Sequence, residues 1–421
     1  MPDPLPDPLG QAALAPITVE QHLAQILDAV EPLEPCQVPL LDALGLVVAA
    51  EVRSELDLPS FDNSAMDGYA VRYADVVTAT AESPVHLPVL ETIGAGSERS
   101  VVVEPGTAAK VMTGAPVPPG ADVVVPYEWT DAGAEQVRVD RAPEPGQHVR
   151  PAGEDVARGD LLIEAGTELT ARHLGLLAAV GRPTVGVRPR PRVVIISTGS
   201  ELRDPGQPLA PDSIYDANSY LLAAAARDLG AQPYRVGLVP DEPEAFLASL
   251  RDQLGRADAV VTSGGVSMGD FDIVKAALRE LGVWFGPVAM QPGKPQGFGL
   301  LEAAGGARVP IFCLPGNPVS SYLSFQLFVA PALRKMMGLP VADEARVTAR
   351  LTHAVTSPPA RRQFLRAAYD PETGSVSPVG GPGSHLVGYL AEADALIVVP
   401  EDATELAAGA SVEVIPLEQH R

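Results

Sequence analysis

The chain has 421 residues, more than one hydrophobic core usually organises, so several structural units are expected. Its formal net charge of −23 at pH 7 argues against a general electrostatic grip on nucleic acid or on an acidic membrane, because both need clustered Lys and Arg. The two cysteines, Cys36 and Cys313, stand in no CxxC or CxxH context, which argues against a zinc site or a redox pair.

Residues 1–16 lack a basic segment followed by an apolar core, so we interpret them as a disordered tail rather than a secretory signal. No apolar run approaches the roughly 18 residues that span a bilayer. The sequence therefore predicts a soluble, cytoplasmic protein with no membrane partner.

A first helix is predicted after Thr18, where apolar residues recur at helical spacing. Residues 51–145 are rich in Val, Pro, Gly and Thr, which indicates β structure with tight loops and little helix. A second helix is predicted to start after Thr170 and to end at Gly181.

From residue 189 strands and helices alternate, which predicts a three-layer α/β unit with a mainly parallel sheet over 189–338. Residues 339–421 alternate like strands of a small β-barrel or sandwich. In the α/β unit we expect strands at 192–197, 234–239, 258–263, 282–290 and 309–314, helices at 219–229, 244–254 and 271–281, and a long helix after Asn317.

Polar residues of the α/β unit gather after the strands, where parallel sheets bind ligands. The loop 263–269 leads into a predicted helix, so its backbone amides can hold a phosphate; a plain turn is the alternative. The residues expected to bind ligand here are Ser263, Gly264, Gly265, Ser267, Asp216, Asn218, Pro315, Gly316, Asn317 and Ser320.

Glu201, Asp241 and Asp272 each lie on a loop at the same predicted sheet edge. Three carboxylates beside a phosphate cradle can hold Mg²⁺ through oxygen ligands. Helix N-capping is the alternative for such acids, above all for Asp241 and Asp270, and it applies equally to Asp216 and Asn218.

Lys294 is presented by a loop that two prolines and a glycine make rigid, with a solvated lysine as the alternative. Arg361, Arg362 and Arg366 offer donors for an oxyanion, although an alternating strand also exposes arginines routinely. Ser384 lies near them or belongs to a turn.

In the β-rich part, residues 60–70 form a polar and aromatic segment that contains Asp67 and has no strong helix or strand pattern. Thr113 stands between two Val-rich strands, where a hairpin turn is the simpler interpretation.

Together these segments resemble the molybdopterin molybdenumtransferases, whose eukaryotic relative is the E domain of gephyrin. Seven motifs carry the resemblance, in the family's order and with compatible spacing, from about Thr18 to the C-terminus. They are PSFDNSAMDGYA, MTGAPVPPGADVVVPYE, GEDVARGD, STGSEL, SGGVSMGDFD, PGKP and LPGNPVSSY.

The resemblance implies four domains. They are an elongated domain I (17–50 and 146–188), a β-rich domain II inserted at 51–145, an α/β domain III (189–338) and a β-barrel domain IV (339–421). It also implies a head-to-tail homodimer, in which Asp67 and Thr113 of one subunit approach the domain III crevice of the other.

The implied reaction joins molybdate to adenylyl-molybdopterin with Mg²⁺ and yields molybdenum cofactor, AMP and water. Catalytic roles are implied for Asp67, Thr113, Glu201, Asp241 and Asp272, the last three as metal ligands. Lys294, Arg362 and Ser384 would receive molybdate through charge-assisted hydrogen bonds.

A molybdopterin adenylyltransferase is one alternative, and such an enzyme is also an expected transient partner. A non-catalytic scaffold like gephyrin is the other. The chain departs from the family's pattern at Gln291, where many relatives have lysine, and at Gly388 and Tyr389, where a serine pair is common. The sequence leaves open whether tungstate is also accepted.

Overall fold

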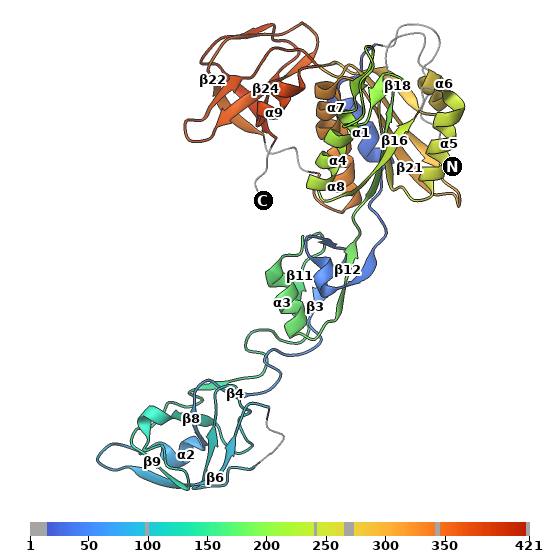
Figure 1. The fold of residues 1–421 in the computed structure, drawn as a ribbon. Coiled ribbons are helices and arrows are strands. Elements are labelled where there is room, and N and C mark those ends of the chain that lie inside the picture. The colour runs from blue at the N-terminus through green and yellow to red at the C-terminus, as the bar shows by residue number, and fades with distance from the viewer. Residues whose placement is uncertain (1–14, 97–100, 240–241, 265–272, 342–345, 418–421) are drawn as a thin grey trace. The chain divides into compact units, whose positions relative to one another are not determined.

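The computed structural model describes residues 15–96, 101–239, 242–264, 273–341 and 346–417. The chain forms two compact units (Figure 1). Unit 1 comprises Met1–Cys36, Gly45–Ala49 and Val187–Arg421, and unit 2 comprises Gln37–Leu44 and Ala50–Gly186. Of the helices in the described part of the chain, none has the length and apolar character that a membrane crossing needs.

The first predicted helix is confirmed as α1 (Val19–Ala29) of unit 1. Thr18 and Gln21 form a capping box: the Gln21 backbone N–H donates to Thr18 Oγ1 at 3.1 Å, and the Thr18 N–H donates to Gln21 Oε1 at 2.9 Å. The helix buries Val19, His22 and Ile26, which pack into the core of the α/β part of unit 1.

The α/β part contains a six-stranded sheet in the order β16-β13-β17-β21-β20-β18. The first four strands are parallel, whereas β20 and β18 run antiparallel to their neighbours. The strands are β13 (Arg192–Thr198), β16 (Gln232–Val239), β17 (Ala259–Ser263), β18 (Trp284–Pro287), β20 (Pro295–Glu302) and β21 (Arg308–Leu314).

Helices cover both faces of this sheet, because successive strand residues point to opposite sides. Val193 and Ile195 of β13 join the core of α1, α4, α7 and α8, whereas Val194 and Ile196 join the core of α5 and α6. The predicted three-layer α/β fold is thus confirmed. The helices are α4 (Asn218–Asp228), α5 (Pro243–Leu254), α6 (Ile273–Glu280), α7 (Pro318–Ser324), the π-helical η3 (Phe325–Val329) and α8 (Ala330–Met336).

Strand β20 was not expected from the sequence, because glycines weaken a strand pattern. The structure shows what those glycines permit. A Cβ on Gly297 would lie 2.5 Å from the Phe285 ring, and one on Gly299 would lie 2.9 Å from Val283 Cα. The strand therefore needs glycine so that the neighbouring chain around β18 can pack against it.

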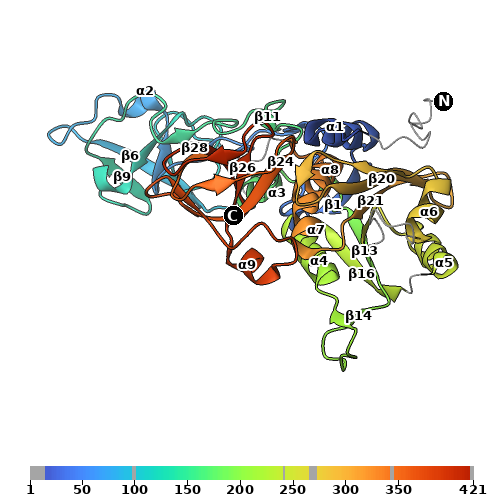
Figure 2. The same ribbon diagram turned by 90° about the horizontal axis from the view of Figure 1, so that it is seen from above.

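The C-terminal part of unit 1 is a closed β-barrel, visible from above in Figure 2. Strand β24 pairs with both β25 and β26, which closes the circle β24-β25-β22-β28-β26. Closure decides between the predicted barrel and sandwich. The elements are β22 (Val347–Leu351), β23 (Val355–Thr356), β24 (Arg362–Asp370), β25 (Ser375–Pro378), α9 (Val387–Glu392), β26 (Ala395–Val399), β27 (Glu405–Leu406) and β28 (Ser411–Pro416).

A short strand, β19 (Met290–Gln291), pairs in parallel with the start of β24. The loop that carries Lys294 is therefore attached to the barrel on one side and to β20 on the other.

Unit 2 contains a five-stranded sheet in the order β8-β5-β7-β6-β9 around a core that includes Tyr69 and Val125. Its only described helical pieces within 51–145 are short, as the sequence predicts. The elements are β5 (Gly68–Val71), α2 (Tyr73–Val76), β6 (Val85–Ile93), β7 (Ala108–Val111), β8 (Val123–Pro126), η2 (Tyr127–Trp129) and β9 (Gln136–Val139).

Segments that flank this sheet in sequence pair with each other. Strand β4 (Asn63–Ser64) pairs with β10 (Val149–Arg150), and β3 (Val52–Arg53) pairs with β11 (Leu161–Ile163). The second predicted helix is α3 (Ala171–Ala179), capped by Thr170. In an inserted domain, the segment that enters the domain and the segment that leaves it lie side by side, and these pairings are of that kind. The domain boundaries remain a proposal.

The remaining short elements are β1 (Cys36–Pro39), η1 (Leu40–Ala43), β2 (Val47–Val48), β12 (Thr184–Arg188), β14 (Leu202–Arg203) and β15 (Ile214–Tyr215). Strands β14 and β15 bound a loop that projects from the α/β part (Figure 2).

Candidate functional site

Asn218, at the start of α4, joins two strand ends of the parallel sheet. Its Nδ2 donates to Ser263 Oγ at 2.7 Å and to the Gly316 carbonyl at 2.6 Å. Its Oδ1 is buried and has no hydrogen-bond partner among the described residues. A buried acceptor without a donor is costly, so this oxygen is suited to receive a ligand N–H.

Ser321, in α7, completes this network. Its Oγ donates to the Pro315 carbonyl at 2.6 Å and lies 3.1 Å from Ser263 Oγ. Sequence reasoning passed over Ser321, although it is part of the LPGNPVSSY motif. Ser320, which was predicted instead, is buried at the same helix start.

Gly264 follows β17 at φ +93°, a conformation that L side chains rarely adopt. A Cβ there would lie 2.8 Å from the Thr198 carbonyl oxygen. The glycine is thus required by the close approach of two strand ends. This requirement is also compatible with the plain turn alternative. A Cβ on Gly316 would lie 3.6 Å from Gly264 Cα, so the two glycines are neighbours at the strand ends.

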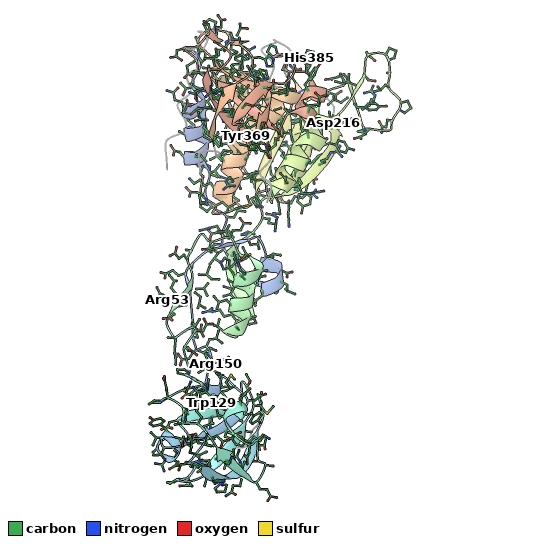
Figure 3. The ribbon with its side chains drawn as sticks, turned by 90° about the vertical axis from the view of Figure 1, so that its left-hand side faces the viewer. Arg53, Trp129, Arg150, Asp216, Tyr369 and His385 are labelled. Carbon is green, nitrogen blue, oxygen red and sulfur yellow. The ribbon has the colours of Figure 1, made fainter. Side chains whose placement is uncertain are left out.

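Asp216 is buried and its carboxylate is satisfied within the protein; Figure 3 labels it where the β14–β15 loop joins the α/β part. It accepts from Ser219 N at 3.0 Å, from Ser219 Oγ at 2.6 Å and from Ser197 Oγ at 3.1 Å. Arg235 Nη2 lies 4.0 Å away. These contacts fit the capping alternative: Asp216 fixes the start of α4 and thereby Asn218.

Glu201 is exposed, and no described residue donates to its carboxylate. Its oxygens lie close to Gly199, where a Cβ would meet Glu201 Oε2 at 2.5 Å. The described residues contain no group of three His, Cys, Asp or Glu side chains that could hold a metal ion. Asp241, Gly265, Ser267, Asp270 and Asp272 lie outside the described residues.

Two buried side chains, Gln296 and Ser324, support the loop that carries Lys294. Gln296 Nε2 donates to the Gly293 carbonyl at 2.7 Å and to Ser324 Oγ at 2.6 Å. Gly293 has φ +101°. Lys294 itself is half-buried, and no described carboxylate forms an ion pair with it, so its ammonium retains its donors for an anion.

Arg362, predicted to receive an oxyanion, is engaged by two carboxylates. It forms ion pairs with Glu20 of α1 and with Glu401, whose Oε2 lies 3.2 Å from Arg362 Nε. These partners raise the pKa of Arg362 although burial opposes the shift. The side chain joins the N-terminal helix to the barrel, which is a structural role that the sequence did not indicate.

Arg366, in contrast, organises the loop before Ser384. Its Nη1 donates to the Gly383 carbonyl at 3.0 Å and its Nη2 donates to the Gly381 carbonyl. The side chain is buried, its Nε has no partner among the described residues, and burial lowers its pKa. By sequence, Arg366 is one of three possible oxyanion donors, but molybdate is assigned to Arg362 instead.

Ser384 contacts the start of α7 through two hydrogen bonds. Asn317 Nδ2 donates to Ser384 Oγ at 2.9 Å, and the Val319 N–H donates to the Ser384 carbonyl at 3.0 Å. The barrel therefore places Ser384 against the segment that follows β21, at Asn317.

In unit 2, Asp67 and Thr113 lie together as predicted candidates. The Thr113 N–H and Oγ1 both donate to Asp67 Oδ1, at 2.6 and 2.8 Å. These bonds lower the pKa of the Asp67 carboxyl, the backbone bond contributing most. Thr113 thus holds Asp67 ionised and oriented.

Comparison with known proteins covers both units. Three family descriptions match the chain: "MoeA N-terminal region (domain I and II)" over residues 17–181, "Probable molybdopterin binding domain" over 194–335, and "MoeA C-terminal region (domain IV)" over 348–417. The protein named molybdopterin molybdenumtransferase 2 from Mycobacterium tuberculosis H37Rv is 45% identical over 94% of this chain and 98% of its own length. The chain belongs to the molybdopterin molybdenumtransferase (MoeA) family.

Relatives with lower sequence identity also match this chain over nearly its whole length. The molybdopterin molybdenumtransferase of Bacillus subtilis is 33% identical over 95% of this chain and 94% of its own. The crystal structure of the molybdopterin biosynthesis MoeA protein from Pyrococcus horikosii matches with a TM-score of 0.84 and 33% identity, covering 96% of this chain and all of that one.

The structure shows the surroundings of the three positions at which the sequence departs from the family's pattern, Gln291, Gly388 and Tyr389. Gln291 Oε1 is buried without a partner among the described residues, as is Gln363 Oε1, and the two residues are register partners in β19 and β24. Tyr389 packs over Gly380, where a Cβ would lie 2.6 Å from its ring, and Gly388 lies on α9 with open space around it.

Proposed function

We propose that this chain is a molybdopterin molybdenumtransferase that inserts molybdate into adenylyl-molybdopterin and releases AMP and water. The observation that carries the proposal is the hydrogen-bond network at the strand ends that joins Asn218, Ser263, Gly316 and Ser321. The barrel adds Ser384 to the neighbouring Asn317. Family membership supports the reaction class.

The strand ends combine donors and acceptors that suit an adenylylated pterin. The Gly264 backbone approaches closely because it has no side chain, and Asn218 Oδ1 can accept from a ring N–H. Lys294 and Ser384 are assigned to molybdate, since an ammonium and a hydroxyl both donate to an oxyanion. Arg362 is a weaker candidate because Glu20 and Glu401 already engage it.

Mg²⁺ is the proposed metal, with Glu201, Asp241 and Asp272 as ligands. Glu201 fits, because an exposed carboxylate without a protein donor is the ligand type that Mg²⁺ prefers. When bound, the ion would neutralise phosphate charge and polarise a phosphoryl oxygen.

We also propose that the protein is a cytoplasmic homodimer in which Asp67 and Thr113 act on substrate bound to the partner subunit. The Thr113 hydrogen bonds lower the pKa of the Asp67 carboxyl, which favours the charged form that can assist in holding the metal. The overall charge of −23 does not oppose anion binding, since physiological salt screens exposed charges beyond about 8 to 10 Å.

The test is a reconstitution with purified protein. Adenylyl-molybdopterin, micromolar molybdate and Mg²⁺ should give AMP and active cofactor, whereas molybdopterin with ATP should consume no ATP. The reverse pattern would identify an adenylyltransferase. If the folded protein forms AMP in neither mixture, the non-catalytic scaffold would be the hypothesis that is left. Asp272→Ala should remove the Mg²⁺-dependent AMP release.

A further inference from the structure

Lys110, in β7, lies on the face of the unit 2 sheet that also carries Tyr69 and Val125. Tyr69 is the antiparallel register partner of Lys110 on one side and of Val125 on the other. Just beyond the ends of these strands, Tyr127 of η2 contacts Met112 through its hydroxyl and the Asp67 carbonyl through its N–H. The face ends where Thr113 holds the Asp67 carboxylate.

The ammonium of Lys110 is oriented by an aromatic ring. Its Nζ lies 5.0 Å from the centroid of Tyr127, which packs edge-on against the buried Tyr69 at 5.5 Å. Tyr127 is fixed in turn, because its N–H donates to the Asp67 carbonyl at 3.2 Å and its hydroxyl donates to Met112 Sδ at 3.8 Å. Burial and the Asp67 charge raise the pKa of Tyr127, so it stays a neutral donor.

No described carboxylate pairs with Lys110, although acids outnumber bases in the chain by 53 to 30. It is also the sole lysine of unit 2. A contact with a ring face uses none of the three N–H donors of an ammonium. Lys110 is therefore a positioned cation whose hydrogen bonds remain available, and Tyr127, which orients it, also contacts Asp67.

We propose that Lys110 binds the phosphate of the substrate that leaves as AMP, with Tyr127 as its positioning residue. This inference rests on the proposed function. An ammonium is a compact charge suited to phosphate, and Asp67 would hold the accompanying metal ion or a proton rather than the anion. The inserted domain then supplies a cation as well as an acid.

The experiment compares Lys110→Met, which keeps length and removes charge, with Lys110→Arg, which keeps charge. Lys110→Met should raise the KM for adenylyl-molybdopterin by about tenfold or more, as expected for a lost hydrogen bond to a charged group. The KM for molybdate should not change, and Lys110→Arg should stay within about threefold of the wild type. Arg150→Met, an exposed charge of the same unit labelled in Figure 3, is the matched control.

Binding of AMP and of adenosine, measured by calorimetry, is the second readout. Lys110→Met should weaken AMP but not adenosine. Equal AMP affinity and equal KM in Lys110→Met and the wild type would overturn the proposal. If the wild type releases no AMP from adenylyl-molybdopterin, the proposed function fails. The AMP affinities of Lys110→Met and the wild type still decide whether Lys110 binds phosphate. Should Lys110→Met not fold, Lys110→Gln takes its place.

Discussion

Asn317 and Ser384, 67 residues apart, are joined by a 2.9 Å hydrogen bond from Asn317 Nδ2 to Ser384 Oγ. The bond connects the start of α7 in the α/β part to a loop of the barrel. The second bond, from the Val319 N–H to the Ser384 carbonyl, does not need the hydroxyl. The hydroxyl can therefore be removed without detaching the loop.

We predict that Asn317→Ala and Ser384→Ala are coupled. Urea unfolding of both variants and the double variant should give an interaction of about 1 kcal/mol, the usual net contribution of one hydrogen bond. Both single variants should also raise the KM for molybdate. Additive unfolding energies would show that the bond does not contribute.

Thr113→Ala should raise the pKa of the Asp67 carboxyl. The change removes the hydroxyl bond and keeps the larger contribution of the backbone N–H, so the pKa should move only part of the way toward the ordinary 3.8. Because the folded-state pKa is depressed, the ionised form is stabilised above the unfolded pKa, and this stabilisation is lost as pH falls through the folded pKa. Carbon NMR titration of the carboxyl measures this.

Thr113→Ser is the control for that titration, since it keeps the hydroxyl. An identical Asp67 pKa in Thr113→Ala and the wild type would contradict the hydrogen-bond assignment.

Gly68→Ala should destabilise unit 2 strongly. A Cβ at Gly68 would lie 2.1 Å from the Val125 carbonyl oxygen, so β5 and β8 would have to separate. We expect a loss of about 3 kcal/mol or more in the free energy of unfolding, as for severe overpacking. Gly94→Ala, with nothing within 4 Å of its Cβ, should cost less than about 1 kcal/mol.

Arg366→Met should loosen the loop that carries Ser384. The Gly381 and Gly383 carbonyls would lose their donor, at about 1 kcal/mol for each hydrogen bond, because water can reach an exposed or half-buried carbonyl. Hydrogen exchange of residues 380–386 should accelerate and the KM for molybdate should rise. Arg361→Met, which removes an exposed arginine nearby, should change neither.

Gln291→Lys should strengthen molybdate binding. The position lies beside the Lys294 loop, and its Oε1 has no partner among the described residues. A second cation should lower the KM for molybdate by about threefold to tenfold, limited by the cost of burying charge. A KM equal to or above that of the wild type, in a folded variant, would argue against a molybdate pocket at this loop.

Much of the fold follows from sequence patterns because its strong signals are local. The first helix begins after Thr18 as predicted, and the alternation of β13 divides between two cores as a doubly covered strand requires. Gly230 and Gly282 end helices at positive φ, as expected, whereas Gly255 ends α5 in a right-handed conformation.

The site was predicted less completely, because partners distant in sequence decide what a polar residue does. Asp216 has the same pattern as a ligand but is satisfied by Ser197 and Ser219. Arg362 and Arg366 are indistinguishable as neighbours on a strand, yet Glu20 engages the first and two loop carbonyls engage the second. No spacing rule reveals that Tyr127 lies beneath Lys110.

Strand β24 is hydrogen-bonded to β19, β25 and β26, and it carries Arg362, Gln363 and Arg366. A shift of one residue along it would exchange the faces of all three side chains at once. Insertions or deletions within 362–370 should therefore be excluded during evolution and in engineering, while the turn at 371–374 should accept them.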